Sequence, residues 1–111
     1  MQIDNYSFGE IEINGKKYKS DLIIFPEKIH ANWWRKQGHL LVREDIEDVI
    51  SYKPEIFIIG TGKYNLMKIP DRLKDELNKL EFELFIAKTD RAVKKFNDVE
   101  GKKVAALHLT C

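Results

Sequence analysis

The chain has 111 residues and a formal net charge of +1, with hydrophobic residues at 43% and charged residues at 33%. This length supports a single domain over residues 1–111, and the composition is that of a globular protein. The balanced charge provides no bulk field for binding nucleic acid, and no apolar run approaches the roughly 18 residues of a membrane-spanning helix. We therefore expect no nucleic-acid partner and no membrane insertion.

Residues 10–19 carry the signature of a β-hairpin. Ile11 and Ile13 alternate with glutamates, Asn14-Gly15 follows, and a lysine-rich segment comes next. Asn-Gly favours a two-residue turn because both central residues of such a turn need a positive φ angle. The pattern predicts a hairpin with its tip at Asn14-Gly15 and with both isoleucines on the buried face.

The next segments predict two strands and a short helix. Residues 21–25 are an apolar strand that Pro26 stops, and residues 29–35 are compatible with a further strand. In such a strand Trp33 and Trp34 would point to opposite faces, one toward the core and one toward solvent or a partner. Residues 46–50 have the apolar spacing of a short amphipathic helix.

The most informative segment is the apolar run at residues 56–59, which ends in Gly60-Thr61-Gly62. An uninterrupted apolar run of this length predicts a strand buried on both faces. In open α/β sheets, the loops at the carboxyl ends of such strands are the usual place for a ligand. We therefore regard Gly60-Thr61-Gly62 as one part of a candidate ligand-binding rim.

The remaining residues alternate between helix and strand. We expect a helix with Leu73, Leu77 and Leu80 on one face, a strand at residues 82–87, a helix capped by Thr89, and a last strand at residues 104–109. If the strand at residues 82–87 runs parallel to that at residues 56–59, the loop at residues 60–69 and Thr89 become neighbours on one rim.

Two groups of residues are candidate sites. The tentative ligand-binding rim consists of Gly60, Thr61, Gly62 and Thr89, with Arg35 or His39 reaching over it. We choose Arg35 as the cation because its planar guanidinium suits a carboxylate or phosphate, and a functional rim predicts that Arg35→Ala abolishes binding with little change in thermal midpoint. The tentative interaction surface consists of Trp33, Trp34 and Arg35, because exposed tryptophan beside arginine is typical of protein interfaces.

Known nucleotide, metal and catalytic motifs are not matched. Gly60-Thr61-Gly62-Lys63 lacks the earlier glycine and the following hydroxyl residue of a phosphate-binding P-loop, since Phe57 and Tyr64 stand there. The three histidines have no metal-ligand spacing, and His108 lies in an apolar strand where a hydrogen-bonded core histidine is expected. We assign no catalytic residue, no metal site and no cofactor.

The chain also resembles a known family through a series of short motifs. The matching segments are Phe8-Gly9, residues 13–18 and 20–24, Trp33-Trp34-Arg35, Gly38-His39, residues 54–62, Thr89 with Ala92-Val93 and Phe96-Asn97, and residues 104–111. Their order, and the Leu-His-Leu-Thr-Cys ending, are similar to a small α/β family of conserved hypothetical proteins. That family includes the vertebrate adipogenesis-associated domain protein and a mitochondrial complex I assembly factor.

The resemblance implies a three-layered α/β fold. A central mixed sheet would have helices on one side and an N-terminal β-hairpin layer plus a helix on the other. It also implies an assembly or scaffolding role for the mitochondrial relatives and no established activity for most prokaryotic members.

Two classes of function follow. We favour a non-catalytic protein-interaction or assembly module with an unidentified protein partner or a second copy of the chain. The alternative is an enzyme, or a binder of a small molecule or anion, that uses the rim of Gly60-Thr61-Gly62 and Thr89. The single cysteine, Cys111, and an N-terminus without the pattern of a secretory signal lead us to expect a cytoplasmic protein.

Overall fold

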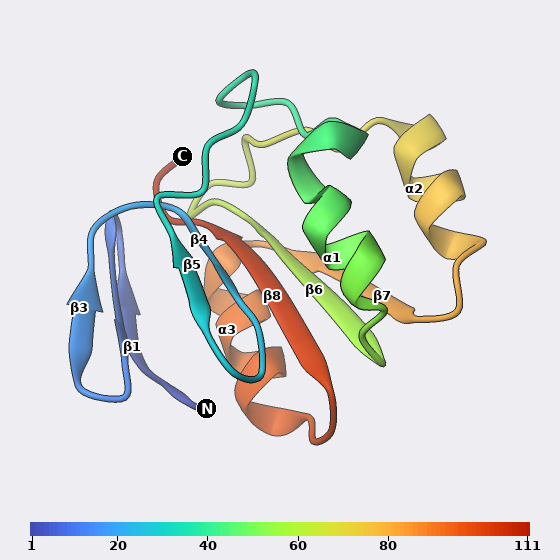
Figure 1. The fold of residues 1–111 in the computed structure, drawn as a ribbon. Helices are drawn as coiled ribbons and strands as arrows, with labels where there is room; N and C mark the ends of the chain where they lie inside the picture. Colours follow the sequence, from blue (N-terminus) through green and yellow to red (C-terminus); the bar gives the residue numbers. More distant parts are fainter.

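The computed structural model describes residues 1–111 and contains eight strands, three α-helices and one 3₁₀-helix (Figure 1). In chain order the elements are β1 (Ile3–Ser7), β2 (Glu10–Ile13), β3 (Lys16–Tyr18), β4 (Leu22–Ile24), β5 (Ile29–Ala31), η1 (Arg43–Ile46), α1 (Glu47–Tyr52), β6 (Ile56–Thr61), α2 (Asp71–Asn78), β7 (Glu83–Ala87), α3 (Thr89–Asp98) and β8 (Lys103–His108). None of the helices combines the length and the apolar character needed to cross a membrane.

The central sheet is mixed, with the strand order β5-β4-β8-β6-β7. β6 runs parallel to both β7 and β8, whereas β4 is antiparallel to β5 and β8. Every residue of β6 is buried, which confirms the predicted strand covered on both faces. The strand continues through Gly60 and Thr61, so the chain turns only at Gly62, which has a φ of 101°.

The sheet is covered on both faces, which confirms the expected three layers (Figure 1). On one face, residues of α1 and α2, such as Val49 and Leu77, pack against Phe57 and Ile59 of β6. On the other face, Ile11 of the N-terminal sheet and Phe96 of α3 pack in a second cluster with Ile58. Alternate residues of the central strand therefore face two separate apolar layers.

The N-terminal hairpin forms as predicted. Ile13 pairs with Lys16 across a two-residue turn, and Asn14 and Gly15 have φ angles of 52° and 81°. Ile11 and Ile13 are fully buried against the central sheet, as expected. Local turn chemistry therefore determines the register of this hairpin, because positive φ at both positions is tolerated best by Asn and Gly.

The strand predicted over residues 29–35 is shorter than expected. β5 ends at Ala31, because Asn32 has a φ of 56° and leaves the extended conformation. Trp33 and Trp34 lie in the loop beyond it, yet they still diverge: Trp33 is 5% exposed and Trp34 is 76% exposed. The prediction of one inward and one outward tryptophan is thus confirmed, although no strand produces it.

Two details of the predicted helices are wrong. α2 ends at Asn78, so Leu80 lies outside the helix and packs against the core from the following turn. The N-cap of α3 is Lys88 rather than Thr89, and no side chain caps this helix. Thr89 is instead the first helical residue, and its side chain is fully buried between β6 and β8.

The connections after β6 and β7 diverge. β6 leads into α2, which covers one face of the sheet, and β7 leads into α3, which covers the opposite face. The two strands are hydrogen-bonded neighbours and run parallel. The chain therefore leaves adjacent strand ends in opposite directions, an arrangement that opens a crevice at the carboxyl edge of an α/β sheet.

Candidate functional site

Several segments meet where β6 and β8 end, and we call this region the loop edge. It comprises the turn at residues 8–9, the loop at residues 32–41, the loop at residues 62–70 and the last residues, 109–111 (Figure 1). Backbone hydrogen bonds join these segments: Gly9 N–H donates to Leu109 O, and Lys68 N–H donates to His39 O. The loop edge is therefore a single hydrogen-bonded structure rather than a set of separate loops.

Two residues of the predicted rim, Gly62 and Thr89, are in contact at this edge. The Gly62 N–H donates to Thr89 Oγ1 at 2.8 Å, and the Thr89 N–H donates to Gly62 O at 3.2 Å. Thr89 Oγ1 in turn donates to the carbonyl oxygen of His108 at 2.6 Å. The parallel arrangement of β6 and β7 thus brings the loop after β6 and the start of α3 together, as expected.

The protein itself occupies the space beside the rim glycines. A Cβ placed on Gly60 would lie 2.9 Å from Thr89 Oγ1 and 2.9 Å from the Leu107 side chain. A Cβ on Gly62 would collide with the backbone of Cys111. Close packing of the chain therefore accounts for glycine at both positions, and no room for a ligand remains between the rim glycines and Thr89.

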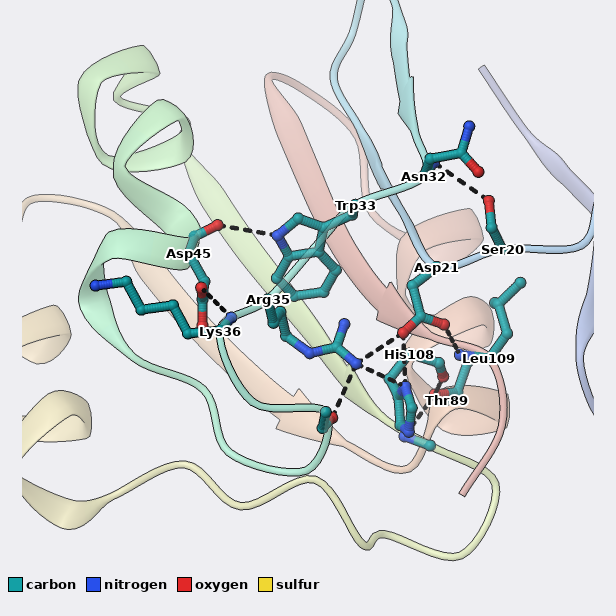
Figure 2. A network of polar contacts seen from close by, with 12 residues as sticks. Ser20, Asp21, Asn32, Trp33, Arg35, Lys36, Asp45, Thr89, His108 and Leu109 are labelled. Carbon is teal, nitrogen blue, oxygen red and sulfur yellow. Dashed lines mark hydrogen bonds and ion pairs between the residues drawn. The ribbon is translucent and has the colours of Figure 1, made fainter.

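A buried polar cluster of Asp21, Arg35 and His108 lies beside the rim (Figure 2). Arg35 Nη2 is 2.8 Å from Asp21 Oδ2, and His108 Nδ1 is 2.7 Å from the same oxygen. Because the carboxylate can only accept, both partners donate to it. The other carboxylate oxygen accepts the Leu109 N–H at 2.7 Å. One carboxylate thus links the loop at residues 32–41, β8 and the C-terminal residues.

Arg35 is held from several directions. Its Nη2 also donates to Gly38 O at 2.9 Å, and the guanidinium carbon lies 4.7 Å from the centre of the Trp33 ring. Its Nε and Nη1 are buried without a hydrogen-bond partner. Trp33 is fixed in turn, since its Nε1–H donates to Asp45 O at 2.9 Å. Arg35 is therefore stacked and ion-paired inside the protein instead of projecting from the rim.

The electrostatics of the cluster favour an ionised Asp21. Desolvation by burial acts to raise the pKa of Asp21, but the hydrogen bonds from His108, the Leu109 N–H and Arg35 outweigh it. The net result is a pKa below the ordinary value of 3.8. At neutral pH the cluster therefore contains a carboxylate that compensates the buried guanidinium.

The other predicted site residues have different positions. His39 is exposed, and its ring centre lies 5.7 Å from that of His108. Thr61 faces away from the cluster, with its Oγ1 2.5 Å from Asn65 Oδ1 and 3.1 Å from Ala87 O. Arg35 is thus linked to Thr89 only indirectly, through Asp21 and then His108, whose carbonyl oxygen accepts from Thr89. Thr61 lies on the opposite side of the rim.

The sequence reasoning missed Asp21 as the centre of this cluster. The available signal was the register of two strands that are distant in the sequence. β4 and β8 pair antiparallel with Leu22 opposite Leu107, so Asp21 and His108 are the next residues along the same register. The contact between the two side chains could be inferred only once β4 and β8 were identified as neighbouring strands.

The arrangement has limited chemical possibilities. No group of three or more His, Cys, Asp or Glu side chains is placed to hold a metal ion. His108 Nε2 is buried and makes no hydrogen bond, and no hydroxyl or thiol contacts the ring nitrogens of His108. The observed contacts thus hold loops in place and neutralise a buried charge.

Comparisons with known proteins show which fold this is. Residues 3–109 match the family described as "Protein of unknown function (DUF498/DUF598)". A conserved hypothetical protein of Pyrococcus horikoshii OT3 is 23% identical, with a TM-score of 0.82 and coverage of 100% of both chains. A Bartonella henselae protein described as an outer membrane protein is 24% identical, with a TM-score of 0.81 and coverage of 98% of this chain and 94% of that chain. At these identities the structural likeness concerns the fold alone.

Proposed function

This chain belongs to the DUF498/DUF598 family of proteins of unknown function, and we propose that it is a non-catalytic protein-interaction or assembly module whose docking face is the loop edge. The observation that carries the proposal is the pair of neighbouring tryptophans. Trp33 is buried and Trp34 is 76% exposed, directly before the buried Arg35. The indole of Trp34 is thus presented to solvent from a backbone that is anchored on both sides.

Further apolar side chains are exposed on the same edge. Tyr64 is 63% exposed and Phe8 is 50% exposed, and their ring centres are 6.0 Å apart. Leu66 belongs to the same loop as Tyr64 and is also exposed. Exposed aromatic residues are enriched at the centres of protein interfaces, where they contribute much of the binding free energy. The surface of another protein is therefore the binding partner that suits the loop edge best.

The buried cluster supports this role by holding the docking face rigid. The ion pair of Arg35 with Asp21 fixes the segment that carries Trp34, and the Leu109 N–H bond to Asp21 fixes the chain end nearby. A preorganised surface loses less conformational entropy on binding, so the same contacts give higher affinity. The resemblance to a family that includes an assembly factor agrees with this role, and the lone cysteine suits the cytoplasm.

Site-specific photocrosslinking tests the proposal. A photoreactive amino acid replaces Trp34 or, as a matched control, Lys19, an exposed residue after β3. In host cells, we expect one defined adduct from position 34 that is absent from position 19. The adduct should disappear when Phe8→Ser and Tyr64→Ser are added to the position-34 protein. Equal adducts from both positions would exclude the loop edge as the docking face.

Sedimentation of the purified protein identifies the kind of partner. A monomer at all concentrations, combined with an adduct to a different protein, supports an interaction module for another chain. A dimer that Trp34→Ser dissociates would identify a second copy of this chain as the occupant. A monomer that gives no adduct at position 34 would refute the proposed function.

A ligand binder or enzyme at the predicted rim is the second candidate. Most of the predicted rim is filled by the protein, as described above for Gly60, Gly62 and Thr89. The observation that favours a ligand at this end of the sheet concerns Thr61, which lines a cleft on the outer side of the rim. That cleft has a chemistry of its own.

A further inference from the structure

A cleft lies at the carboxyl ends of β6 and β7, between the loop after β6, α2 and the start of α3. Its wider part has a volume of about 410 Å³ and its narrower part about 180 Å³, and the two share Asn65, Lys74 and Ile86 as lining residues. The connections from β6 and β7 leave toward opposite faces of the sheet (Figure 1). The residues that line the cleft lie at this point. In open α/β sheets, ligands bind at such a topological switch point.

The charges around the cleft have one sign. Lys68 of the loop, Lys74 of α2, and Lys88 and Arg91 at the start of α3 line it. None of these four side chains forms an ion pair, and no Asp or Glu lines the cleft. Two acids adjoin these cations in the sequence: Asp75 follows Lys74, and Asp90, between Lys88 and Arg91, accepts a hydrogen bond from the Arg91 backbone N–H. Four uncompensated cations from three segments therefore converge on one concave surface.

A second cavity provides an internal comparison. Its volume is about 520 Å³, larger than either part of the cleft, and it lies at the opposite, amino end of β6 and β7. Its charged lining residues are Lys53, Lys79, Glu55 and Glu81, so positive and negative charges balance there. Both cavities are concave, so shape alone does not distinguish them. They differ in charge, which is uniformly positive only in the cleft at the carboxyl edge of the sheet.

The floor of the cleft is polar and fixed, and its wall is partly apolar. Thr61 Oγ1 contacts both Asn65 Oδ1 and Ala87 O, which joins the loop after β6 to the end of β7. Met67, Ile69 and Ile86 contribute apolar lining. Small-molecule sites commonly have this composition, with apolar walls and a few fixed polar groups.

We propose that this cleft binds a small organic phosphate, with the phosphate held by Lys88 and Arg91 and the rest of the molecule against Ile86. A single carboxylate would leave most of the four positive charges uncompensated, whereas a phosphate monoester or diphosphate carries two or more negative charges. Arginine can bind phosphate oxygens in a bidentate manner, and the lysines add point charges. This site shares the loop at residues 62–70 with the docking face proposed above, but it uses other side chains and does not depend on that proposal.

Titration calorimetry with adenosine monophosphate and adenosine diphosphate at low salt tests the proposal, with adenosine and inorganic phosphate as comparisons. The test variant is Lys88→Gln/Arg91→Gln. The matched control is Lys16→Gln/Lys19→Gln, which removes the same charge from exposed positions on and just after β3. We expect saturable binding of the nucleotides, with at least about a tenfold loss of affinity in the test variant and no more than about a twofold change in the control.

The outcomes separate a built site from general electrostatic attraction. If adenosine and inorganic phosphate both bind more weakly than the nucleotides, this supports a site that uses the phosphate and the apolar wall together. Equal losses in the test and control variants would refute the cleft, because net charge alone would then explain binding. Absence of nucleotide binding, or binding only of a single-stranded RNA oligomer, would overturn the proposal as well. Thermal unfolding of each variant without ligand verifies that it is folded.

Discussion

Arg35 Nη2 and Asp21 Oδ2 lie 2.8 Å apart in a buried ion pair that joins the loop after β5 to the start of β4. The Arg35 side chain is 5% exposed and that of Asp21 is 17% exposed. A partly buried pair of this kind costs desolvation free energy to form, but removing only one partner costs more, because it leaves an uncompensated charge inside the protein. The pair therefore links the stability of the fold to the position of Trp34.

Arg35→Ala is expected to lower the free energy of unfolding by about 3 kcal/mol. The variant loses the ion pair, the bond to Gly38 O and the stacking on Trp33. Because Arg35 is buried, its replacement should lower the thermal midpoint, contrary to the expectation from the sequence. Urea unfolding measures the change. Arg43→Ala is the matched control, because its ion pairs are exposed, and it should cost far less stability than Arg35→Ala.

Asp21→Asn should reduce stability at neutral pH and make it less sensitive to acid. The pKa of Asp21 is below its ordinary value of 3.8 in the folded protein, so the folded state binds this proton more weakly than the unfolded state does. The stabilisation is complete above the ordinary pKa and is lost as the pH falls below it through the folded pKa. Unfolding free energies measured from neutral pH down to below 3.8 should therefore converge for the two proteins. A constant difference across this range would contradict the assignment.

Tyr6 predicts a change at the alkaline end of the pH range. Burial, followed by the charge of Asp90, raises the pKa of Tyr6 to about 12, and its hydroxyl donates to Leu109 O at 2.9 Å. The folded state therefore holds this proton more tightly, and the stabilisation present below the ordinary value of 10.0 is lost as the pH rises toward about 12. Tyr6→Phe should abolish this part of the alkaline loss. Tyrosinate absorbance should show one fewer late-titrating tyrosine in the variant.

Gly62→Ala should destabilise the protein by about 2 kcal/mol. The φ of Gly62 is 101°, and an added Cβ would meet the Cys111 backbone. Gly38→Ala is the control, because φ at Gly38 is not in the positive range and an added Cβ has nothing within 4 Å. Thermal unfolding of the two variants tests the claim. Similar midpoints for both would show that the C-terminal residues move aside without cost.

Local sequence chemistry predicted the parts of the fold that depend on local interactions. Asn14-Gly15 gave the hairpin turn, because positive φ is an intrinsic preference of these residues. The apolar run in β6 gave the central strand, because burial on both faces leaves no polar position. Thr89 shows the limit of this reasoning. Threonine is a good cap, but a tertiary contact with Gly62 and His108 takes its hydroxyl.

The buried cluster and the cleft depend on contacts between distant segments, so the sequence could not reveal them. Asp21 and His108 meet only because β4 and β8 pair across most of the chain. The cleft cations, Lys68, Lys74, Lys88 and Arg91, are spread over several elements, and a net charge of +1 for the whole chain conceals their convergence. Composition averages charge over the whole surface, whereas a ligand responds to the local field.

Replacing each of the two tryptophans with alanine should have very different effects on the free energy of unfolding. Trp33→Ala removes a buried ring, its stacking with Arg35 and a hydrogen bond to Asp45 O, so it should lower the free energy of unfolding by about 3–5 kcal/mol. Trp34→Ala removes an exposed ring and should change it by less than about 0.5 kcal/mol. Urea unfolding measures both.

Fluorescence provides an independent check, because the chain has only these two tryptophans. Emission from Trp34→Ala should be that of a buried indole and should shift strongly on unfolding. Emission from Trp33→Ala should be that of an exposed indole before and after unfolding. If Trp34→Ala were as destabilising as Trp33→Ala, Trp34 would be a structural residue, and the loop edge would lose its main docking side chain. A stable Trp34→Ala protein that no longer captures its partner would separate the docking role of this residue from folding.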